Sequence, residues 1–279
     1  MTLQDAPNRY VEAADVRFGY RKIGAEDGIP LVLLQHFTGT IDSWDPQLVS
    51  TLARDRPVIL FNNRGVGTSS GTTPDSVAAM ADDADLFLSA LGIDQADLLG
   101  FSLGGFMAQV LAARSPSRVR KLILVGTAPQ GGEEHLLEVV ADAAQRRGSE
   151  DIRLPLFFTP SATSQAAGRA FLARQAVRAE RDPDRGEAVS NPQAKALIDW
   201  CAMADDDDAL LKSIAQPTLV MSGAADTMLP AANAYRMFRA MPDAQLILYP
   251  DAGHGALFQN ATLFSAHCAL FLAGVAQAD

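Results

Sequence analysis

The sequence contains little cysteine, and its cysteines form no motif. Cys201 and Cys268 are the only two in 279 residues, they lie far apart, and neither belongs to a CxxC motif. This argues against a small disulfide-stapled scaffold and against a cysteine-based metal site. We therefore expect two unpaired thiols in a reducing compartment, and no metal.

Positive charge and long apolar runs are also scarce. Lys and Arg number 23 against 33 Asp and Glu, which gives a formal net charge of −10. Nucleic acids and anionic membrane surfaces are bound through basic patches, so neither is an expected partner. No apolar run reaches the ~20 residues of a membrane span, and Met1–Pro7 lacks the basic region and apolar core of a signal peptide. We expect a cytoplasmic protein that acts on a small molecule; no heptad or charge pattern predicts its oligomeric state.

The apolar residues that are present form short runs separated by helical patterns. Alternation of this kind is typical of an α/β fold, with a mostly parallel central sheet flanked by helices. The clearest helices are expected at residues 82–91, 103–113 and 262–273. Strands are expected at residues 16–21, 30–34, 57–61, 96–101, 121–125, 218–222 and 244–249.

The spacing of these strands is interrupted once. No strand-like run occurs between residues 125 and 218, an interval far longer than the ~30 residues of a βα unit. The intervening residues are rich in Ala, Arg, Gln, Glu and Asp. The sequence therefore predicts a core made of residues 1–128 and 216–279, with residues 129–215 inserted as a helical lid.

A candidate nucleophile lies in the pentapeptide Gly100-Phe101-Ser102-Leu103-Gly104, between an expected strand and an expected helix. A serine in such a turn is held with its hydroxyl exposed, and the flanking glycines avoid clashes with neighbouring backbone. The amide of Leu103 would begin the helix, where unpaired N–H groups favour negative charge. Ser102 is thus the predicted nucleophile and Leu103 a predicted oxyanion donor.

A serine hydroxyl needs a histidine base, and that base needs a carboxylate partner. His254 follows the last expected strand in a glycine-flanked loop, at the same sheet edge as Ser102. Asp226 follows the preceding strand in a loop of small residues, and Asp251 is its rival. We predict the triad Ser102, Asp226 and His254, because the tight loop between Asp251 and His254 makes a side-chain bond between them awkward.

The chain resembles the α/β-hydrolase superfamily over nearly its whole length, in the branch of small lidded serine hydrolases. The resemblance rests on residues 33–40, residues 62–69, the Ser102 turn, the Asp226 loop and the loop from Asp251 to His254. It implies a second oxyanion donor, the backbone N–H of Phe37. It also implies an enzyme that needs no cofactor.

The sequence departs from the resembled family at two places. Gln35-His36 stands where His-Gly is usual, and Asn62-Asn63-Arg64 stands where Asp-x-Arg is common. His36 either lines the pocket and bonds a substrate oxygen or holds the loop by hydrogen bonds. Arg64 either braces the scaffold or contacts substrate.

Apolar residues near the motif loops and in the inserted segment are candidates for the substrate pocket. With His36, the predicted substrate-binding residues are Trp44, Phe157, Trp200, Met228 and Leu257.

The leading functional hypothesis is a serine hydrolase that cleaves a carboxylic ester or a related acyl bond of a small, largely apolar substrate through an acyl-enzyme. Two alternatives use the same triad: hydrolysis of a C–C bond next to a ketone, and perhydrolysis as in cofactor-free haloperoxidases. A ligand-binding protein on a hydrolase scaffold is a further alternative, which an intact triad disfavours.

Overall fold

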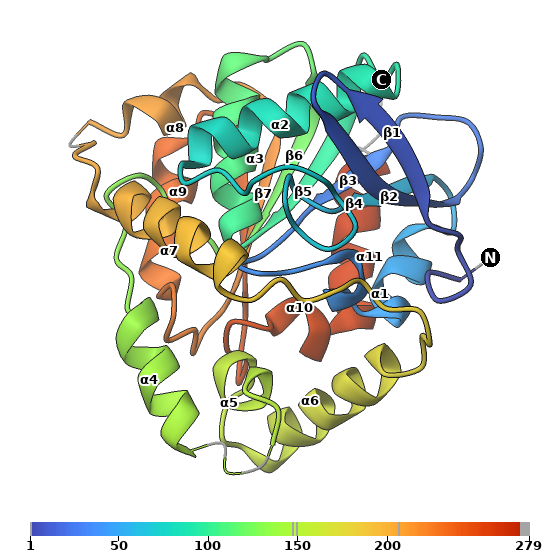
Figure 1. Ribbon diagram of the computed structural model, residues 1–279. Helices are drawn as coiled ribbons and strands as arrows, with labels where there is room; N and C mark the ends of the chain where they lie inside the picture. The colour runs from blue at the N-terminus through green and yellow to red at the C-terminus, as the bar shows by residue number, and fades with distance from the viewer. Residues whose placement is uncertain (1, 147, 149, 206, 274–279) are drawn as a thin grey trace.

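A central sheet organises the chain in the computed structural model, which describes residues 2–146, 148, 150–205 and 207–273 (Figure 1). Within these residues the sheet has eight strands in the order β1-β2-β4-β3-β5-β6-β7-β8. Strands β1 and β2 pair antiparallel, β2 is also antiparallel to β4, and the remaining pairs are parallel. The strands are β1 (Arg9–Ala13), β2 (Val16–Gly24), β3 (Leu31–Leu34), β4 (Pro57–Phe61), β5 (Ala96–Phe101), β6 (Val119–Val125), β7 (Thr218–Gly223) and β8 (Ala244–Tyr249). The predicted fold class is confirmed.

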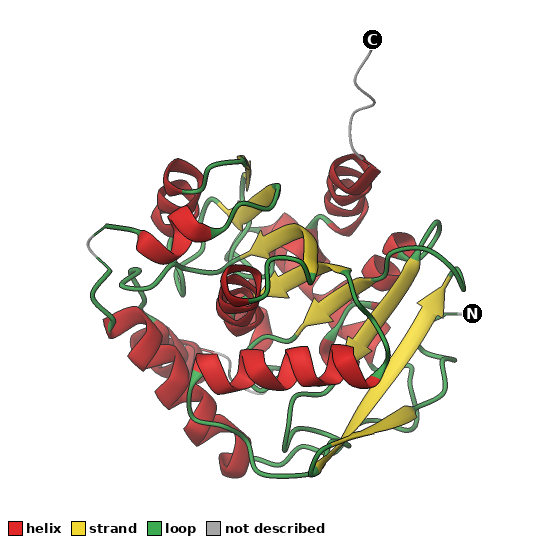
Figure 2. Ribbon diagram, turned by 90° about the horizontal axis from the view of Figure 1, so that it is seen from above, coloured by secondary structure: helices red, strands yellow, loops and turns green. Residues whose placement is uncertain are grey.

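Helices cover both faces of the sheet, as the view from above shows (Figure 2). Successive side chains of a strand point to opposite faces, so Val32 and Leu34 of β3 join one apolar core while Leu31 and Leu33 join the other. Helices α2 (Val77–Ala90), α3 (Leu103–Arg114) and α9 (Ala231–Ala240) contribute to the first core. Helices α1 (Pro46–Leu52), α10 (Ala256–Gln259) and α11 (Ala261–Ala273) contribute to the second.

Residues 129–215, here called the helical segment, connect β6 to β7. Their helices are α4 (Leu136–Arg146), α5 (Arg153–Phe157), α6 (Ala162–Gln175), α7 (Glu187–Ala202) and α8 (Ala209–Ser213). Figure 1 shows α4, α5 and α6 along the lower side of the molecule, beneath the sheet. Their use as a lid stays a prediction.

Two buried contacts attach the helical segment to the core. The Trp200 ring of α7 stacks on Phe106 of α3 with centroids 5.3 Å apart, and its Nε1–H donates to the Ala128 carbonyl at 3.2 Å. Arg174 of α6 donates two hydrogen bonds to the buried carboxylate of Asp45, which also caps the N-terminus of α1. The segment is therefore joined to the core through both apolar packing and charge.

The sequence analysis missed some elements and misplaced some boundaries, among them the end of β2, the start of β6 and the start of α2. Strand β1 is an edge strand whose residues are mostly exposed, so it lacks an apolar signature. Helix α1 is short and depends on the Asp45 cap. Helix α2 begins at Val77 rather than near residue 82, because the hydroxyl of Ser76 accepts a hydrogen bond from the Ala79 amide and caps the helix there.

None of the helices in the described ranges combines the length and the apolarity needed to cross a membrane.

Trp200 provides a test of how firmly the helical segment is attached. We expect Trp200→Ala to lower the free energy of unfolding by about 3–5 kcal/mol, because a large buried ring and its hydrogen bond are lost. Urea denaturation measures the change, with Tyr235→Ala as the control because Tyr235 is exposed. A loss below about 1 kcal/mol, no more than ordinary surface substitutions cause, would contradict the anchoring role.

Candidate active site

Ser102 occupies a strained turn between β5 and α3. Its φ of +54° and ψ of −121° lie outside the regions that L-residues prefer, and three hydrogen bonds hold it there. The Ser102 amide donates to the Val125 carbonyl at 2.9 Å, while the Ser102 carbonyl accepts from the Thr127 hydroxyl and the Gly105 amide, each at 2.8 Å. The turn therefore lifts the Ser102 side chain out of the sheet.

The glycines of this turn are required by close backbone contacts. A Cβ on Gly104 would lie 2.2 Å from the Leu34 carbonyl oxygen, and one on Gly100 would lie 2.4 Å from the Gly104 oxygen. Both separations are below any van der Waals contact. A side chain at Gly104 would force the turn away from β3, and one at Gly100 would force β5 away from the start of α3.

His254 and Asp226 form a buried pair at the ends of neighbouring strands. His254 Nδ1 lies 2.8 Å from Asp226 Oδ2, and both side chains are almost completely buried. Asp226 Oδ1 accepts from the amides of Met228 and Leu229 at 2.9 and 3.1 Å. Because a carboxylate accepts, Nδ1 carries the proton, and Nε2 is left to act as a base.

The rival carboxylate has a different set of partners. Asp251 accepts hydrogen bonds from the hydroxyls of Thr159 and Ser161, each at 2.6 Å, and these bonds lower the pKa of its carboxyl. Asp251 has a φ of +48°, so it also turns the chain. Its carboxylate therefore fastens the His254 loop to the helical segment.

The other two histidines lie outside this site. His135 is exposed and pairs with Glu133 at 2.9 Å. His267 of α11 is hydrogen-bonded to the Tyr249 hydroxyl at 2.8 Å.

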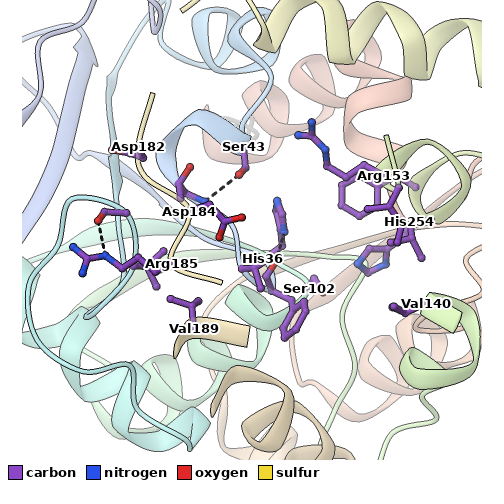
Figure 3. Close-up of a pocket in the computed structure, with 18 of the residues that line it drawn as sticks. His36, Ser43, Ser102, Val140, Arg153, Asp182, Asp184, Arg185, Val189 and His254 are labelled. Atoms are coloured by element: carbon purple, nitrogen blue, oxygen red, sulfur yellow. Dashed lines mark hydrogen bonds between the residues drawn. The ribbon is translucent and has the colours of Figure 1, made fainter. Parts of the chain in front are cut away.

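A cavity of about 530 Å³ brings the predicted site residues together. Ser102, His254, Phe37 and His36 all line it. Figure 3 shows His36 and Ser102 near its middle, Val140 and His254 towards one side, and Asp182 and Arg185 towards the other. The cavity is therefore bordered by the sheet edge and by the helical segment.

The two backbone amides expected to bind an oxyanion have compatible surroundings. Phe37 lies within the turn that the Gly39 amide closes by donating to the His36 carbonyl, and Leu103 is the first residue of α3. Neither amide has a hydrogen-bond acceptor among the described residues, and an uncommitted amide is what an oxyanion site requires.

His36 lies next to the Phe37 amide and has a definite tautomer. Its Nδ1 is 2.9 Å from the Phe37 carbonyl oxygen and must donate to it, so Nε2 bears a lone pair. Nε2 is buried and has no hydrogen-bond partner among the described residues. Burial lowers the pKa of His36 to about 3, so the ring is neutral near neutral pH.

The predicted pocket residues divide into two groups. Phe157 and Met228 line the cavity together with His36. The structure places Trp44, Trp200 and Leu257 in the apolar cores instead, where each is at most 1% exposed. Trp44 packs on Phe101 and Phe258, so its side chain is part of the core and not of the pocket wall.

The other residue left open by the sequence, Arg64, braces the scaffold. Its guanidinium forms a bidentate pair with Asp83 and a second pair with Asp15, and it does not line the cavity. These pairs connect the loop after β4 to α2 and to the β1–β2 turn.

Most of the remaining cavity residues were missed by sequence reasoning. They come from the helical segment, whose helices carry no motif that marks one face as a wall. They include the apolar Leu136, Val140, Ile152, Leu156 and Val189 and the charged Arg153, Arg181, Asp182, Asp184 and Arg185. Across the part of the chain that the structure describes, no group of three or more His, Cys, Asp or Glu could hold a metal ion.

Comparison with known proteins agrees with this geometry. A family model described as alpha/beta hydrolase fold matches residues 29–261. The chain therefore belongs to the alpha/beta hydrolase family, and it is an enzyme of the hydrolase class.

Individual relatives share most of the chain's length. A solved structure of an alpha/beta hydrolase fold protein from Chitinophaga pinensis is 41% identical with a TM-score of 0.91, over 99% of this chain and 100% of that one. A protein named "Putative carbamate hydrolase RutD" from Caulobacter sp. (strain K31) is 28% identical over 261 residues, which is 90% of this chain and 93% of the relative. A 2-hydroxymuconate semialdehyde hydrolase from Pseudomonas sp. (strain CF600) is 26% identical over 276 residues, 97% of this chain and 96% of the relative.

The lowered pKa of His36 has a measurable effect on stability. An unfolded histidine binds a proton below about pH 6.5, whereas folded His36 binds one only near pH 3. The unfolded state thus holds more protons between these values, so His36 lowers the stability of the folded state as the pH falls through this window. We expect His36→Gln to remove part of the acid destabilisation seen between pH 7 and 4.5.

Denaturant midpoints of the wild type and the variant measure this effect at each pH. The exposed His135→Gln serves as the control. Parallel curves for wild type and His36→Gln would contradict a buried, neutral His36.

Proposed function

We propose that this enzyme hydrolyses a carboxylic ester or a related acyl bond, such as a lactone, through an acyl-enzyme formed on Ser102. The observation that carries the proposal is the convergence of the strained Ser102 and the 2.8 Å His254–Asp226 pair on one cavity. A binding protein would gain nothing from this arrangement, since each part of it serves proton transfer or nucleophilic attack.

In the first proposed half-reaction, Ser102 Oγ attacks the acyl carbon while His254 Nε2 takes the hydroxyl proton. Asp226 stabilises the imidazolium that results. The amides of Phe37 and Leu103 would donate to the negative oxygen of the tetrahedral intermediate, each contributing about 3 kcal/mol. The intermediate then collapses as His254 returns the proton to the departing alkoxide.

In the second half-reaction, water attacks the acyl-serine and gives its proton to His254. Collapse of the second tetrahedral intermediate breaks the bond to Ser102 Oγ, which regains the proton. The acid product leaves and the enzyme returns to its starting state. No group beyond the chain's own residues is needed for these steps.

The cavity supports a small substrate with chemically different ends. Leu136, Val140 and Leu156 give one side an apolar surface, in agreement with the largely apolar substrate that the sequence predicts. The other side carries Asp182, whose Oδ2 is buried without a partner among the described residues and whose carboxyl pKa is raised by burial. We therefore propose an apolar group near α4 and α5 and a hydroxyl or amino donor near Asp182.

Three of the pocket residues have proposed roles in this binding. Phe157 and Met228 lie in the wall beside His254 and would pack against the apolar group. His36 Nε2 would accept a hydrogen bond from a donor on the substrate, because its lone pair has no partner among the described residues.

Hydrolysis of a C–C bond next to a ketone is the second candidate, because a hydrolase of a semialdehyde is among the relatives. The same triad would serve it, with a carbanion in place of an alkoxide as the leaving group. A cytoplasmic location is a further proposal, supported by the free thiols of Cys201 and Cys268.

Ser102 is tested with p-nitrophenyl esters of increasing acyl length. We expect Ser102→Ala to lower kcat by at least about 10⁴-fold, because no other nucleophile occupies the turn. A fluorophosphonate probe should label the wild type at Ser102 and leave the variant unlabelled, as peptide mass analysis would show.

Ser115→Ala is the matched control, since Ser115 caps the opposite end of α3. Ester turnover that survives in Ser102→Ala would overturn the proposal. If neither the wild type nor the variant turned over esters while both folded, C–C hydrolysis would take precedence.

The two candidate carboxylates can be separated directly. We expect Asp226→Asn to lower kcat by about 10⁴-fold, because an amide cannot hold His254 in the tautomer with the proton on Nδ1. Asp251→Asn should retain kcat within about threefold, because Asp251 bonds Thr159 and Ser161 instead. A large loss of kcat in Asp251→Asn with little loss in Asp226→Asn would instead make Asp251 the carboxylate partner of His254.

A further inference from the structure

The oxyanion loop, defined here as His36–Gly39, donates a hydrogen bond to the helical segment. The Thr38 amide donates to Gln193 Oε1 of α7 at 2.6 Å. The amide group of Gln193 must be oriented this way, because a backbone N–H can only donate. Gln193 is completely buried, and it does not line the cavity, so it reaches the loop from behind.

This hydrogen bond completes a clamp around one peptide unit. The peptide between Phe37 and Thr38 presents a carbonyl, which accepts from His36 Nδ1 at 2.9 Å, and an N–H, which donates to Gln193. Both polar ends of the unit are thereby fixed by side chains. The unit also lies in a turn closed by the Gly39 amide, which donates to the His36 carbonyl at 2.9 Å.

The same turn contains the proposed oxyanion donor. The peptide between His36 and Phe37 carries the Phe37 N–H at one end and the carbonyl that closes the turn at the other. Thr38 has a φ of +57°, which is uncommon for a β-branched residue. A conformation of this kind persists where surrounding contacts impose it, and the hydrogen bond that the Thr38 amide donates to Gln193 is one of these contacts.

Helix α7 carries the acceptor of this hydrogen bond, and Pro192 lies inside the helix directly before it. Gln193, Ala196, Leu197 and Trp200 form its buried face, at the spacing expected of one side of a helix. Trp200 attaches that face to Phe106 and to the Ala128 carbonyl. The position of the Gln193 oxygen is thus set by the core through the helix.

The hydrogen bonds of the Gln193 side chain indicate why this position holds an amide and not an apolar side chain. Its Nε2 is buried and has no acceptor among the described residues, and an unbonded buried donor is costly. An apolar side chain of similar size would avoid this cost. The amide is therefore explained by its oxygen, the atom that binds Thr38.

We propose that Gln193 is a positioning residue that holds the Phe37 N–H towards the oxyanion. This inference rests on the proposed acyl-enzyme chemistry, because it assigns Phe37 the oxyanion role. Through Gln193, the helical segment forms part of the catalytic geometry, in addition to walling the cavity. Loss of the hydrogen bond lets the turn relax and moves the Phe37 amide, which weakens transition-state binding more than substrate binding.

The test compares Gln193→Met with Gln193→Glu. Met fills the same volume without an acceptor, whereas Glu keeps an accepting oxygen in either protonation state. Removing one oxyanion donor altogether costs about 10²–10³-fold in kcat. For a displaced donor we expect Gln193→Met to lower kcat by about 10- to 100-fold with KM within about threefold, and Gln193→Glu to restore most of kcat.

A reversible trifluoromethyl ketone, which forms a tetrahedral adduct on serine, gives a readout that packing alone would not move. Its affinity should fall in parallel with kcat in Gln193→Met. Hydrogen exchange of the peptide containing residues 35–40 should become faster. Arg174→Met is the matched control. It removes the two hydrogen bonds from Arg174 to Asp45, which join the helical segment to the core, and leaves the oxyanion loop unchanged.

An unchanged kcat in folded Gln193→Met overturns the inference, as does an equal loss in Arg174→Met. A rise in KM alone also overturns it. If Gln193→Met does not fold, Gln193→Asn replaces it, since its amide is one methylene too short to reach Thr38. Survival of turnover in Ser102→Ala would instead remove the proposed function, so the two failures are distinguishable.

Discussion

The structure depends on one constraint, the left-handed conformation of Ser102 where β5 ends and α3 begins. The strain of that turn is offset by the packing of a buried strand against a buried helix, and by hydrogen bonds from Thr127 and to Val125. Because β3, β6 and β7 run parallel to β5, their carboxyl ends reach the same edge. The parallel sheet therefore places the loops that carry Phe37 and Asp226 at the same edge as Ser102.

Buried charged residues help to hold the loops at this edge of the sheet in place. The buried pair of Arg21 and Asp42, with nitrogen and oxygen 2.6 Å apart, joins β2 to the segment that follows β3. Asp42 also accepts from the Asp182 amide of the helical segment at 2.6 Å. Buried carboxylates need partners of this kind to offset desolvation. Asp42 and Asp45 thus link the loops of the core to the helical segment, which lines the cavity.

The cavity has two sides of different origin. Ser102, His254 and the amides proposed to bind an oxyanion come from loops set by the sheet, whereas the apolar and charged walls come from the helical segment. A single fold can thus keep one mechanism and change its substrates by changing the segment. The hydrogen bond between Gln193 and Thr38 joins the two sides.

The sequence by itself determined the parallel sheet, the strand-turn-helix around Ser102 and the positions of Asp226 and His254 in loops after strands. These follow from local patterns, since apolar runs, glycines and their spacing act over a few residues. The tertiary structure alone decided which apolar residues face the cavity. Apolar residues of the kind that line pockets can equally well lie in a core, as Trp44, Trp200 and Leu257 do. Which of the two occurs depends on packing between distant segments. The sequence favoured Asp226 over Asp251 as the partner of His254, and the structure places Asp226 there. The contact of Gln193 with a loop 155 positions away, in contrast, was visible only in the folded chain. Hydrogen bonds between distant residues leave no periodic trace in a sequence, so only the folded chain reveals them.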